Sequence, residues 1–534
     1  MIRIGQIKLS IDHTDENLRK KVAKTLKISS EQILELHIRK QSIDARKKDN
    51  IQFSYCIDVK TKQDAQIVKR CKNNQITLIQ PKKYSFPSCG EEILTNKPII
   101  IGMGPAGLFC AYMLAKHGYQ PILFDRGKAV EDRILDVETF WEGGKLNPDS
   151  NTQFGEGGAG TFSDGKLNTL VKDKDGKNQE VLNIFVAHGA PKNIIYKNKP
   201  HIGTDILVDV VRNMRNEILR YGGKIHFESK VTELLIKNNR VEGILLENGM
   251  KYSSSVIVLA IGHSARDTFH MLHEKKIPMD AKSFAVGFRV EHPQELINIS
   301  QYGVKSSQHL EAADYKVVAK TSNGRGTYSF CMCPGGYVVN ASSEEGRLCV
   351  NGMSYSKRDS KNANSAIIVG VTPEDFGSDD PLAGIHFQRQ LEEKAYQLGN
   401  GKIPVEYLKD FSGIEKGNSK IGEGFTPCMK GKYVFAPIHH ILPDELNRSF
   451  LEGMEHFNRM IPGFSDDYCL VSGIESRTSS PIRIHRDTQT MESVISGLYP
   501  CGEGAGYAGG ITSAAMDGIS VAETIAKRYQ SSVK

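Results

Sequence analysis

Three glycine-rich stretches hold residues whose types and spacing could do chemistry. The first, residues 102–107, reads Gly-Met-Gly-Pro-Ala-Gly and lies between an apolar strand-like stretch and an apolar helix-like stretch. Gly102 permits a tight turn, Gly104 admits a pyrophosphate close to the backbone, and Gly107 lets the helix pack on the strand. Asp125 ends a second predicted strand 18 residues later, where it can accept hydrogen bonds from a ribose. This context predicts a dinucleotide site formed by Gly102, Gly104, Pro105, Ala106, Gly107 and Asp125.

The last glycine-rich stretch, residues 497–511, indicates which dinucleotide this is. It runs from a short apolar strand through Gly502 and Glu503 to a helix that begins near Gly510 and Ile511. A simple NAD domain needs no second site, whereas FAD is long enough to require one. Glu503 could accept a hydrogen bond from a ribityl hydroxyl, and the dipole of the helix could stabilise a reduced flavin ring. The sequence therefore predicts FAD as the cofactor.

The densest glycine run spans residues 155–166. It nearly matches a phosphate-binding P-loop, but Leu167 stands where a magnesium-binding Ser or Thr is required, and no buried strand precedes it. The spacing therefore argues against an NTPase. Exposed backbone N–H groups in such a loop still suit an anionic or flat polar ligand, so we expect cofactor contacts at Gly157 and Gly158.

Two stretches in the middle of the chain fit the same cofactor. Residues 227–231 are predicted to form a strand whose backbone, near Val231, could meet the adenine. Residues 256–262 form an apolar strand that ends at Gly262, where the backbone can pass close to the cofactor.

Several residues are candidates for catalysis, each with an alternative structural role. Cys331 and Cys333 invite a redox interpretation, but residues i and i+2 of a strand lie too far apart for a relaxed disulfide, and burial as small apolar groups is favoured. Lys166 and His263 could move a proton or steady the flavin, and a solvated surface role is equally open for both.

Two arginines just before the last glycine-rich stretch could bind an acidic substrate. Arg477 and Arg483 could each hold a carboxylate through two hydrogen bonds. A network of ion pairs between domains is the alternative interpretation. The sequence does not choose between the two.

Other functional classes lack their motifs. The ten cysteines form no CxxC pair, and His439-His440 has no supporting ligand, so no metal site is predicted. No GxSxG elbow is present, which argues against an α/β-hydrolase. No second dinucleotide fingerprint is seen, so reduction by NAD(P)H stays open but without a dedicated site.

These residues must be positioned by an α/β fold of several domains. The 534 residues suggest three or four domains. We predict an N-terminal module over 1–96 with the ferredoxin-like order β-α-β-β-α-β. A Rossmann-like FAD-binding domain over 97–280 and 472–534 is then interrupted by an inserted α+β domain over 281–471, which would shape the substrate pocket.

The N-terminal module carries the positive charge of the chain. Residues 1–97 hold 20 Lys and Arg against 11 Asp and Glu, a net charge of +9, whereas the whole chain has +7. This charge favours phosphate, but the module lacks the aromatic signature of an RNA-recognition module. Nucleic acid is therefore disfavoured as a partner and not excluded, and docking to protein is the simpler expectation.

The composition is that of an ordinary soluble chain. Apolar residues make up 39% and charged residues 25%, and the mean hydropathy is −0.36. No stretch is long and apolar enough to span a membrane, and charges near the N-terminus do not suit a signal peptide. Scattered cysteines fit a reducing compartment, so we expect a cytoplasmic protein. The oligomeric state is left open.

The glycine-rich stretches and several others together resemble a family of bacterial FAD-dependent dehydrogenases of unassigned substrate, within the glutathione-reductase-like flavoproteins. The resemblance spans about residues 97–530 and is carried by FGEGGAGTFSDGKL (154–167), IGHSARDT (261–268), SFCMCPGGYVVNASSEEG (329–346), NGMSYSKRDSKNANSA (351–366), ESRTSSPIRIHRD (475–487) and GLYPCGEGAGYAGGI (497–511). It implies an oxidoreductase and supports Arg126, which follows the ribose-binding acid, as a further cofactor contact. Asp125 and Glu503 replace the commoner Glu and Asp of flavoproteins.

Three functions follow as hypotheses. The first is an FAD-dependent oxidoreductase that passes a hydride or electrons to or from a small molecule, which could be acidic. The second is an RNA-modifying flavoprotein that uses the basic module. The third is a flavin-binding regulator without turnover.

Overall fold

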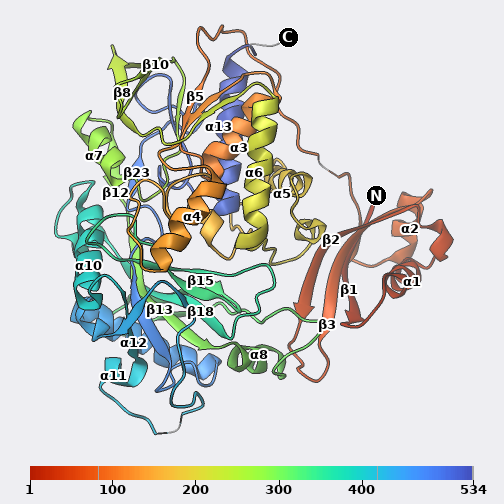
Figure 1. Cartoon of the computed structure of the whole chain (residues 1–534). Helices are drawn as coiled ribbons and strands as arrows, with labels where there is room; N and C mark the ends of the chain where they lie inside the picture. Colours follow the sequence, from red (N-terminus) through yellow and green to blue (C-terminus); the bar gives the residue numbers. More distant parts are fainter. Residues whose placement is uncertain (82, 418, 532–534) are drawn as a thin grey trace.

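The computed structural model describes residues 1–81, 83–417 and 419–531. Figure 1 shows three parts: an N-terminal module to one side, a parallel sheet with its helices at the top, and a larger, mostly antiparallel sheet below. The functional site lies where the second and third parts meet.

The N-terminal module has the expected β-α-β-β-α-β order. Its antiparallel sheet has the strand order β2-β3-β1-β4, which is that of a ferredoxin-like fold. Thr14 caps the first helix by accepting a hydrogen bond from the N–H of Asn17. The elements are β1 (Ile2–Ser10), α1 (Asp15–Leu26), β2 (Glu35–Asp44), β3 (Gln52–Lys60), α2 (Asp64–Cys71) and β4 (Ile76–Leu78).

The apolar residues predicted to alternate on these strands form the core of the module. Ile4 and Ile57 point from the sheet toward Leu18 and Val22 of α1, and all four are fully buried or nearly so. The free edge of strand β2 contacts the rest of the chain through backbone hydrogen bonds. The N–H of Gln41 donates to the carbonyl oxygen of Tyr196, and the N–H of Asn198 donates to the carbonyl oxygen of Gln41.

The second part is built on a five-stranded parallel sheet of order β24-β11-β5-β6-β7. Its strands are short and apolar because both faces are covered, one by helices and the other mainly by a small antiparallel sheet. Their bounds are β5 (Ile99–Ile101), β6 (Ile122–Phe124), β7 (Lys224–His226), β11 (Ile257–Leu259) and β24 (Leu498–Pro500). Strand β24 comes from the C-terminal part of the chain, so the sheet is complete only after the chain has formed the whole third part.

Between β7 and β11 in the sequence, the chain forms a separate three-stranded antiparallel sheet. It consists of β8 (Val231–Lys237), β9 (Arg240–Leu246) and β10 (Lys251–Ser253). The predicted strand over 227–231 was wrong, because β7 ends at His226 and β8 begins only at Val231. Glu228 between them adopts a positive φ of 49°, which breaks the strand.

Helices α3 (Pro105–Lys116) and α13 (Ile511–Arg528) pack face to face beside the parallel sheet (Figure 1). Their contact brings the first and last glycine-rich stretches together. Gly518 of α13 makes this approach close, since a Cβ there would lie 2.2 Å from the carbonyl oxygen of Ala106 in α3. The helices of this part are α3 (Pro105–Lys116), α4 (Val130–Trp141), α5 (Lys177–Ala187), α6 (Thr204–Arg220), α7 (Arg266–Glu274) and α13 (Ile511–Arg528).

The third part is a seven-stranded sheet of order β14-β15-β18-β13-β22-β19-β21, antiparallel except for the β19–β21 pair. Its strands are β13 (Phe284–Pro293), β14 (Val318–Lys320), β15 (Gly326–Cys333), β18 (Asn362–Val371), β19 (Ile403–Tyr407), β21 (Tyr433–Phe435) and β22 (Leu470–Glu475). Its helices are α8 (Gln294–Tyr302), α9 (Pro373–Phe376), α10 (Ala383–Gly399), α11 (Leu408–Ser412) and α12 (Asp444–Met460). Strand β22 continues this sheet four residues beyond position 471, where we had expected the insertion to end.

Two small sheets complete the third part. One joins β16 (Tyr337–Asn340), β17 (Val350–Met353) and β20 (Met429–Lys430). The other pairs β12 (Met279–Ala281) with β23 (Ile482–Ile484), so the chain leaves for the seven-stranded sheet and returns from it side by side.

Candidate functional site

The first glycine turn has the geometry that its sequence predicts. Gly102 adopts a φ of +97°, which disfavours other residues, and a Cβ there would lie 2.4 Å from the carbonyl oxygen of Ala260. A Cβ on Gly107 would lie 1.9 Å from the carbonyl oxygen of Gly102, so that glycine serves the close packing of α3 on the turn.

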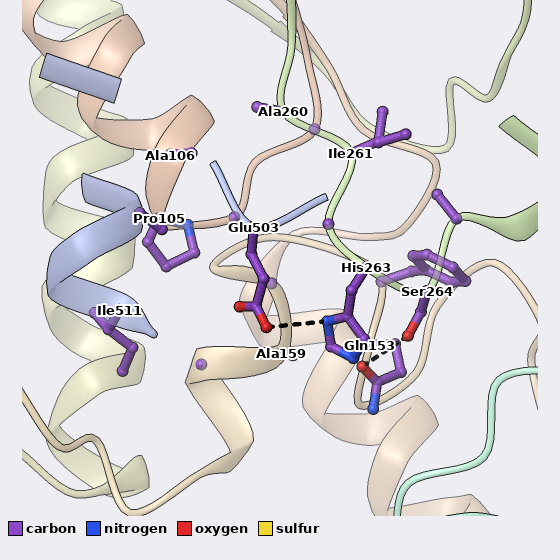
Figure 2. Close-up of a pocket in the computed structure, with 18 of the residues that line it drawn as sticks. Pro105, Ala106, Gln153, Ala159, Ala260, Ile261, His263, Ser264, Glu503 and Ile511 are labelled. Atoms are coloured by element: carbon purple, nitrogen blue, oxygen red, sulfur yellow. Dashed lines mark hydrogen bonds and ion pairs between the residues drawn. The ribbon is translucent and has the colours of Figure 1, made fainter. Parts of the chain in front are cut away.

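The separate glycine-rich stretches meet around one cavity, which Figure 2 shows in close-up. The empty volume within the cavity and its open mouth is about 1490 Å³. Of the predicted cofactor contacts, the following line it: Gly102, Gly104, Pro105, Ala106, Asp125, Arg126, Gly158, Val231, Gly262, Glu503, Gly510 and Ile511. Gly107, Gly157 and Gly502 are not among its lining residues.

Several of these glycines keep the cavity open. A Cβ on Gly262 or Gly510 would meet no atom within 4 Å, and one on Gly104 would meet only the Cα of Gly158, at 3.8 Å. Side chains at these positions would therefore project into free space that a ligand could use. The arrangement fits the cradle that a dinucleotide such as FAD requires.

Two helices begin at the cavity without a side-chain cap. Helix α3 has Gly104 as its N-cap and helix α13 has Gly510, and neither has a side chain that bonds the first N–H groups. Pro105 and Ile511, the first residues of the two helices, lie on the same side of the close-up (Figure 2). Free N–H groups and positive helix dipoles can bind a phosphate and an anionic ring edge.

The central glycine run forms the floor of the first turn. The N–H of Gly157 donates to the carbonyl oxygen of Met103 at 2.8 Å, and Gly158 lies against Gly104. Buried Arg133 holds this run by donating to the carbonyl oxygens of Asn151 at 2.8 Å and Glu156 at 2.6 Å. Gly157 thus supports the site from behind, whereas Gly158 lines it.

The predicted ribose-binding acid is already engaged with the backbone. Both carboxylate oxygens of Asp125 accept hydrogen bonds, one from the N–H of Met103 at 2.7 Å and one from the N–H of Gly127 at 2.9 Å. The neighbouring Arg126 stacks on Phe154 and pairs with Asp267 at 2.8 Å. These contacts fix both residues at the rim of the cavity, and the carboxylate keeps lone pairs for a ribose.

Glu503 and His263 face each other in the cavity, with 3.7 Å between Oε1 and Nδ1 (Figure 2). Burial raises the pKa of Glu503 to about 7, although nearby Lys282 acts in the opposite direction. Burial, helped by Arg477 and Arg266, lowers the pKa of His263 to about 3. The imidazole is therefore neutral near pH 7, so this contact is not an ion pair.

Glu503 should make the stability of the ligand-free protein depend on pH. Its pKa lies above the ordinary value of 4.5, so the folded state keeps a proton that the unfolded chain loses. This contribution is complete below about pH 4.5 and is lost as the pH rises through about 7. The glutamine variant lacks this titration, so thermal-unfolding scans should show it with a higher melting temperature than wild type. We expect the difference between Glu503→Gln and wild type to grow from about pH 5 to about pH 8. Glu91→Gln, at an exposed site, is the control and should show no such trend. A difference in melting temperature that does not grow with pH for Glu503→Gln, or that grows equally for Glu91→Gln, would contradict the raised pKa of Glu503.

The two cysteines of β15 occupy different positions. Cys333 is buried, whereas Cys331 is exposed to the cavity and has a positive φ of 41°, which is unusual for a residue other than glycine. Both thiols are free, and the Cys333 thiol donates to the carbonyl oxygen of Cys331 at 3.3 Å. Although its side chain faces the cavity, desolvation by the surrounding protein raises the pKa of Cys331 above its ordinary value, so its thiol is protonated at neutral pH.

The other catalytic candidates lie in different environments. Lys166 lines the cavity, and its ammonium group donates to the carbonyl oxygen of Met332. Arg477 also lines the cavity, but its guanidinium is paired with buried Glu392 at 2.8 Å and donates to Ser264 and Ser343. Arg483 lies outside the cavity and stacks on Tyr507. The contacts of Arg477 are those of the ion-pair network and occupy its fork, whereas Arg483 is exposed away from the cavity.

Some lining residues carried no local signal in the sequence. Phe330, Asn351 and Gly352 reach the cavity from strands β15 and β17 of the third part. Gln153 and Ser264 approach from the second part and bond each other at 3.2 Å (Figure 2). Only the longer stretches that carry the family resemblance contain Asn351, so a turn motif could not have found it.

Two other classes of site are not found in the described residues. No group of three or more His, Cys, Asp or Glu side chains is placed to hold a metal ion. No helix in residues 1–81, 83–417 and 419–531 combines the length and the apolar character that crossing a membrane requires.

Comparisons with protein families and relatives bear on the same regions. Residues 283–478 match a family model described as FAD-dependent protein, C-terminal domain-like, and residues 1–60 match a domain of unknown function, DUF8436. An uncharacterized protein of Clostridium beijerinckii is 46% identical over 532 residues, which is 99% of each chain. A ribosomal RNA dihydrouridine synthase of Haemophilus influenzae is 25% identical over 183 residues, or 31% of this chain and 40% of that protein.

Solved structures of a dehydrogenase and an oxidase are among the matches to the fold. L-proline dehydrogenase from P. horikoshii has a TM-score of 0.35 at 13% identity, covering 83% of this chain and 96% of its own. Glycine oxidase from Bacillus cereus has a TM-score of 0.34 at 11% identity, covering 81% of this chain and 95% of its own.

Proposed function

The chain belongs to the family of the Clostridium beijerinckii protein, to which it is related over 99% of its length, and we propose that it is an FAD-dependent oxidoreductase acting on a small molecule. The FAD-dependent domain matched at residues 283–478 supports the choice of cofactor.

One observation carries the proposal. Turns that are about 400 residues apart in the sequence line a single cavity, and at Gly104, Gly262 and Gly510 a side chain would project into its open space. A mononucleotide would need only the first turn. Two uncapped helix ends on one cavity suit a longer ligand whose pyrophosphate lies at one helix and whose anionic ring lies at the other.

Each part of the cavity has a task in this function. The N–H groups at the start of α3 would bind the pyrophosphate, Asp125 would accept from the ribose, and Glu503 would bond the ribityl chain. The start of α13 would stabilise negative charge on the ring. FAD, when bound, supplies the hydride or electron transfer, which protein side chains cannot perform alone. Strands β15 and β17 wall that end of the cavity, where a small substrate would bind.

The test is a spectroscopic one on the purified protein. We expect it to be yellow with bound FAD and to bleach when reduced anaerobically by NADH, NADPH or a substrate. Bleaching by a nicotinamide would identify the electron donor, even though no second dinucleotide fingerprint is present. A colourless protein that cannot be reconstituted would refute the proposal, and a yellow one that no donor reduces would favour a regulator without turnover.

A second candidate is an RNA-modifying flavoprotein. The partial match to a ribosomal RNA dihydrouridine synthase favours it, as does the net charge of +9 over residues 1–97. Exposed lysines that form no ion pair within the described residues lie on the two helices of the module, namely Lys21, Lys24, Lys69 and Lys27 just beyond α1. Clustered cations on one surface suit a polyanion.

This candidate predicts RNA binding that depends on those lysines. Lys21→Glu combined with Lys24→Glu and Lys69→Glu should weaken binding of ribosomal RNA fragments by more than about 10-fold at low salt, because each phosphate contact adds to affinity. Gel-shift titrations in rising salt would measure this, with the full chain and unchanged flavin content. Equal binding by the triple variant, or no binding by wild type at low salt, would leave only the small-molecule function.

A further inference from the structure

At the end of the cavity formed by β15 and β17, one lysine side chain has no anionic partner among the described residues. Lys166 lies in the cavity wall, and no carboxylate of the described residues pairs with it. The nearby Asp164 is already paired with buried Arg358. The positive charge of Lys166 is therefore available to a bound molecule.

A second group of donors at the same end has a fixed orientation. The side-chain oxygen of Asn351 accepts hydrogen bonds from the guanidinium of Arg289 at 2.8 Å and from the N–H of Gly352 at 2.7 Å. Both partners can only donate, so the amide cannot be flipped. Its NH₂ group has no partner among the described residues, and Asn351 lines the cavity.

Arg289 holds this arrangement from behind. It is fully buried, forms an ion pair with Glu475, and donates to the carbonyl oxygen of Cys331 at 2.8 Å. One arginine thus positions both Asn351 and Cys331 at the cavity wall. The Cys331 thiol stays protonated, as its raised pKa indicates, so it adds no negative charge beside Lys166.

We propose that Lys166 and Asn351 form the substrate subsite and that the substrate carries a carboxylate or a similar planar oxyanion. The ammonium group supplies charge and the amide supplies directed N–H donors, which together match the oxygens of a carboxylate. This inference rests on the proposed function and assigns its substrate class. It replaces Arg477 and Arg483 as the acid-binding residues, because the fork of Arg477 is occupied and Arg483 lies outside the cavity.

The test is ligand binding to the FAD-loaded protein, with acetate, pyruvate, succinate and benzoate as probes. We expect at least one carboxylate to perturb the flavin absorbance in a saturable way. Lys166→Met and Asn351→Asp should each weaken that binding by about 10- to 100-fold, since each removes a charge-assisted or directed hydrogen bond. Lys172→Met, an exposed lysine outside the cavity, should bind like wild type.

The outcomes separate the subsite from the cofactor. Flavin content and FAD affinity are measured first, and we expect them unchanged in both variants. Loss of FAD from Lys166→Met and Asn351→Asp would show that these donors serve the cofactor and would overturn the subsite. A wild-type protein that holds FAD but binds none of the carboxylates, or variants that bind them equally well, would also overturn it. A protein without FAD would instead refute the proposed function itself.

Discussion

Replacing Gly104 with valine should weaken FAD binding while leaving the fold intact. Gly104 has a φ of −69°, which valine can adopt, and its Cβ position has no neighbour other than the Cα of Gly158 at 3.8 Å. The added side chain would therefore occupy the space at the start of α3 where the pyrophosphate is proposed to bind. We expect FAD affinity to fall by about 10- to 100-fold, the range that overpacking produces.

Fluorescence titration of the flavin-free protein with FAD would measure this loss. Gly326→Val provides a matched control, because Gly326 also has open space around its Cβ position but lies outside the cavity. Both variants should melt close to wild type in the absence of FAD. Normal FAD binding by Gly104→Val would mean that this turn does not approach the cofactor.

Removing Glu392 should destabilise the protein by about 3 to 5 kcal/mol, because it leaves two buried arginines without their shared partner. Its carboxylate pairs with Arg266 at 2.7 Å and with Arg477 at 2.8 Å, and all three side chains are almost completely buried. These two arginines hold the pKa of Glu392 well below its ordinary value. The carboxylate is therefore ionised over the whole neutral range.

Urea denaturation of Glu392→Ala would test this loss of stability. The fluorescence of the single tryptophan, Trp141, would monitor unfolding. Its indole donates to the carbonyl oxygen of Asn340 at 3.0 Å, so it reports on the contact between the second and third parts. Glu393→Ala is the control, since that exposed residue pairs with Arg347 at the surface and should cost about 1 kcal/mol or less. Equal midpoints for the two variants would show that the buried network does not hold the parts together.

Local signals in the sequence predicted the elements around the cavity well. The turn at Gly102, the helix that begins at Ile511 and the Thr14 cap all follow from residues close together in the chain. A glycine turn has a conformational requirement that few other residues meet, so its sequence is informative. The error at residues 227–231 arose because apolar residues on a connecting segment imitate a strand.

The substrate end of the cavity could not be predicted in the same way. Asn351 reaches the cavity only because Arg289, 62 residues earlier, fixes its amide. Arg477 is unavailable to substrate only because Glu392, 85 residues earlier, is buried against it. Such pairings depend on how distant strands are arranged, and no local pattern of residue types records them.

The route of the chain also sets an order of events in time. Strand β24 and the start of α13 complete the parallel sheet and the cavity, and both follow the entire seven-stranded sheet. A ribosome must therefore release residues 498–514 before the pocket has all its walls. A ligand that contacts every wall therefore finds its complete site only after these last elements are made, and the roughly 200 residues between must begin to fold without it.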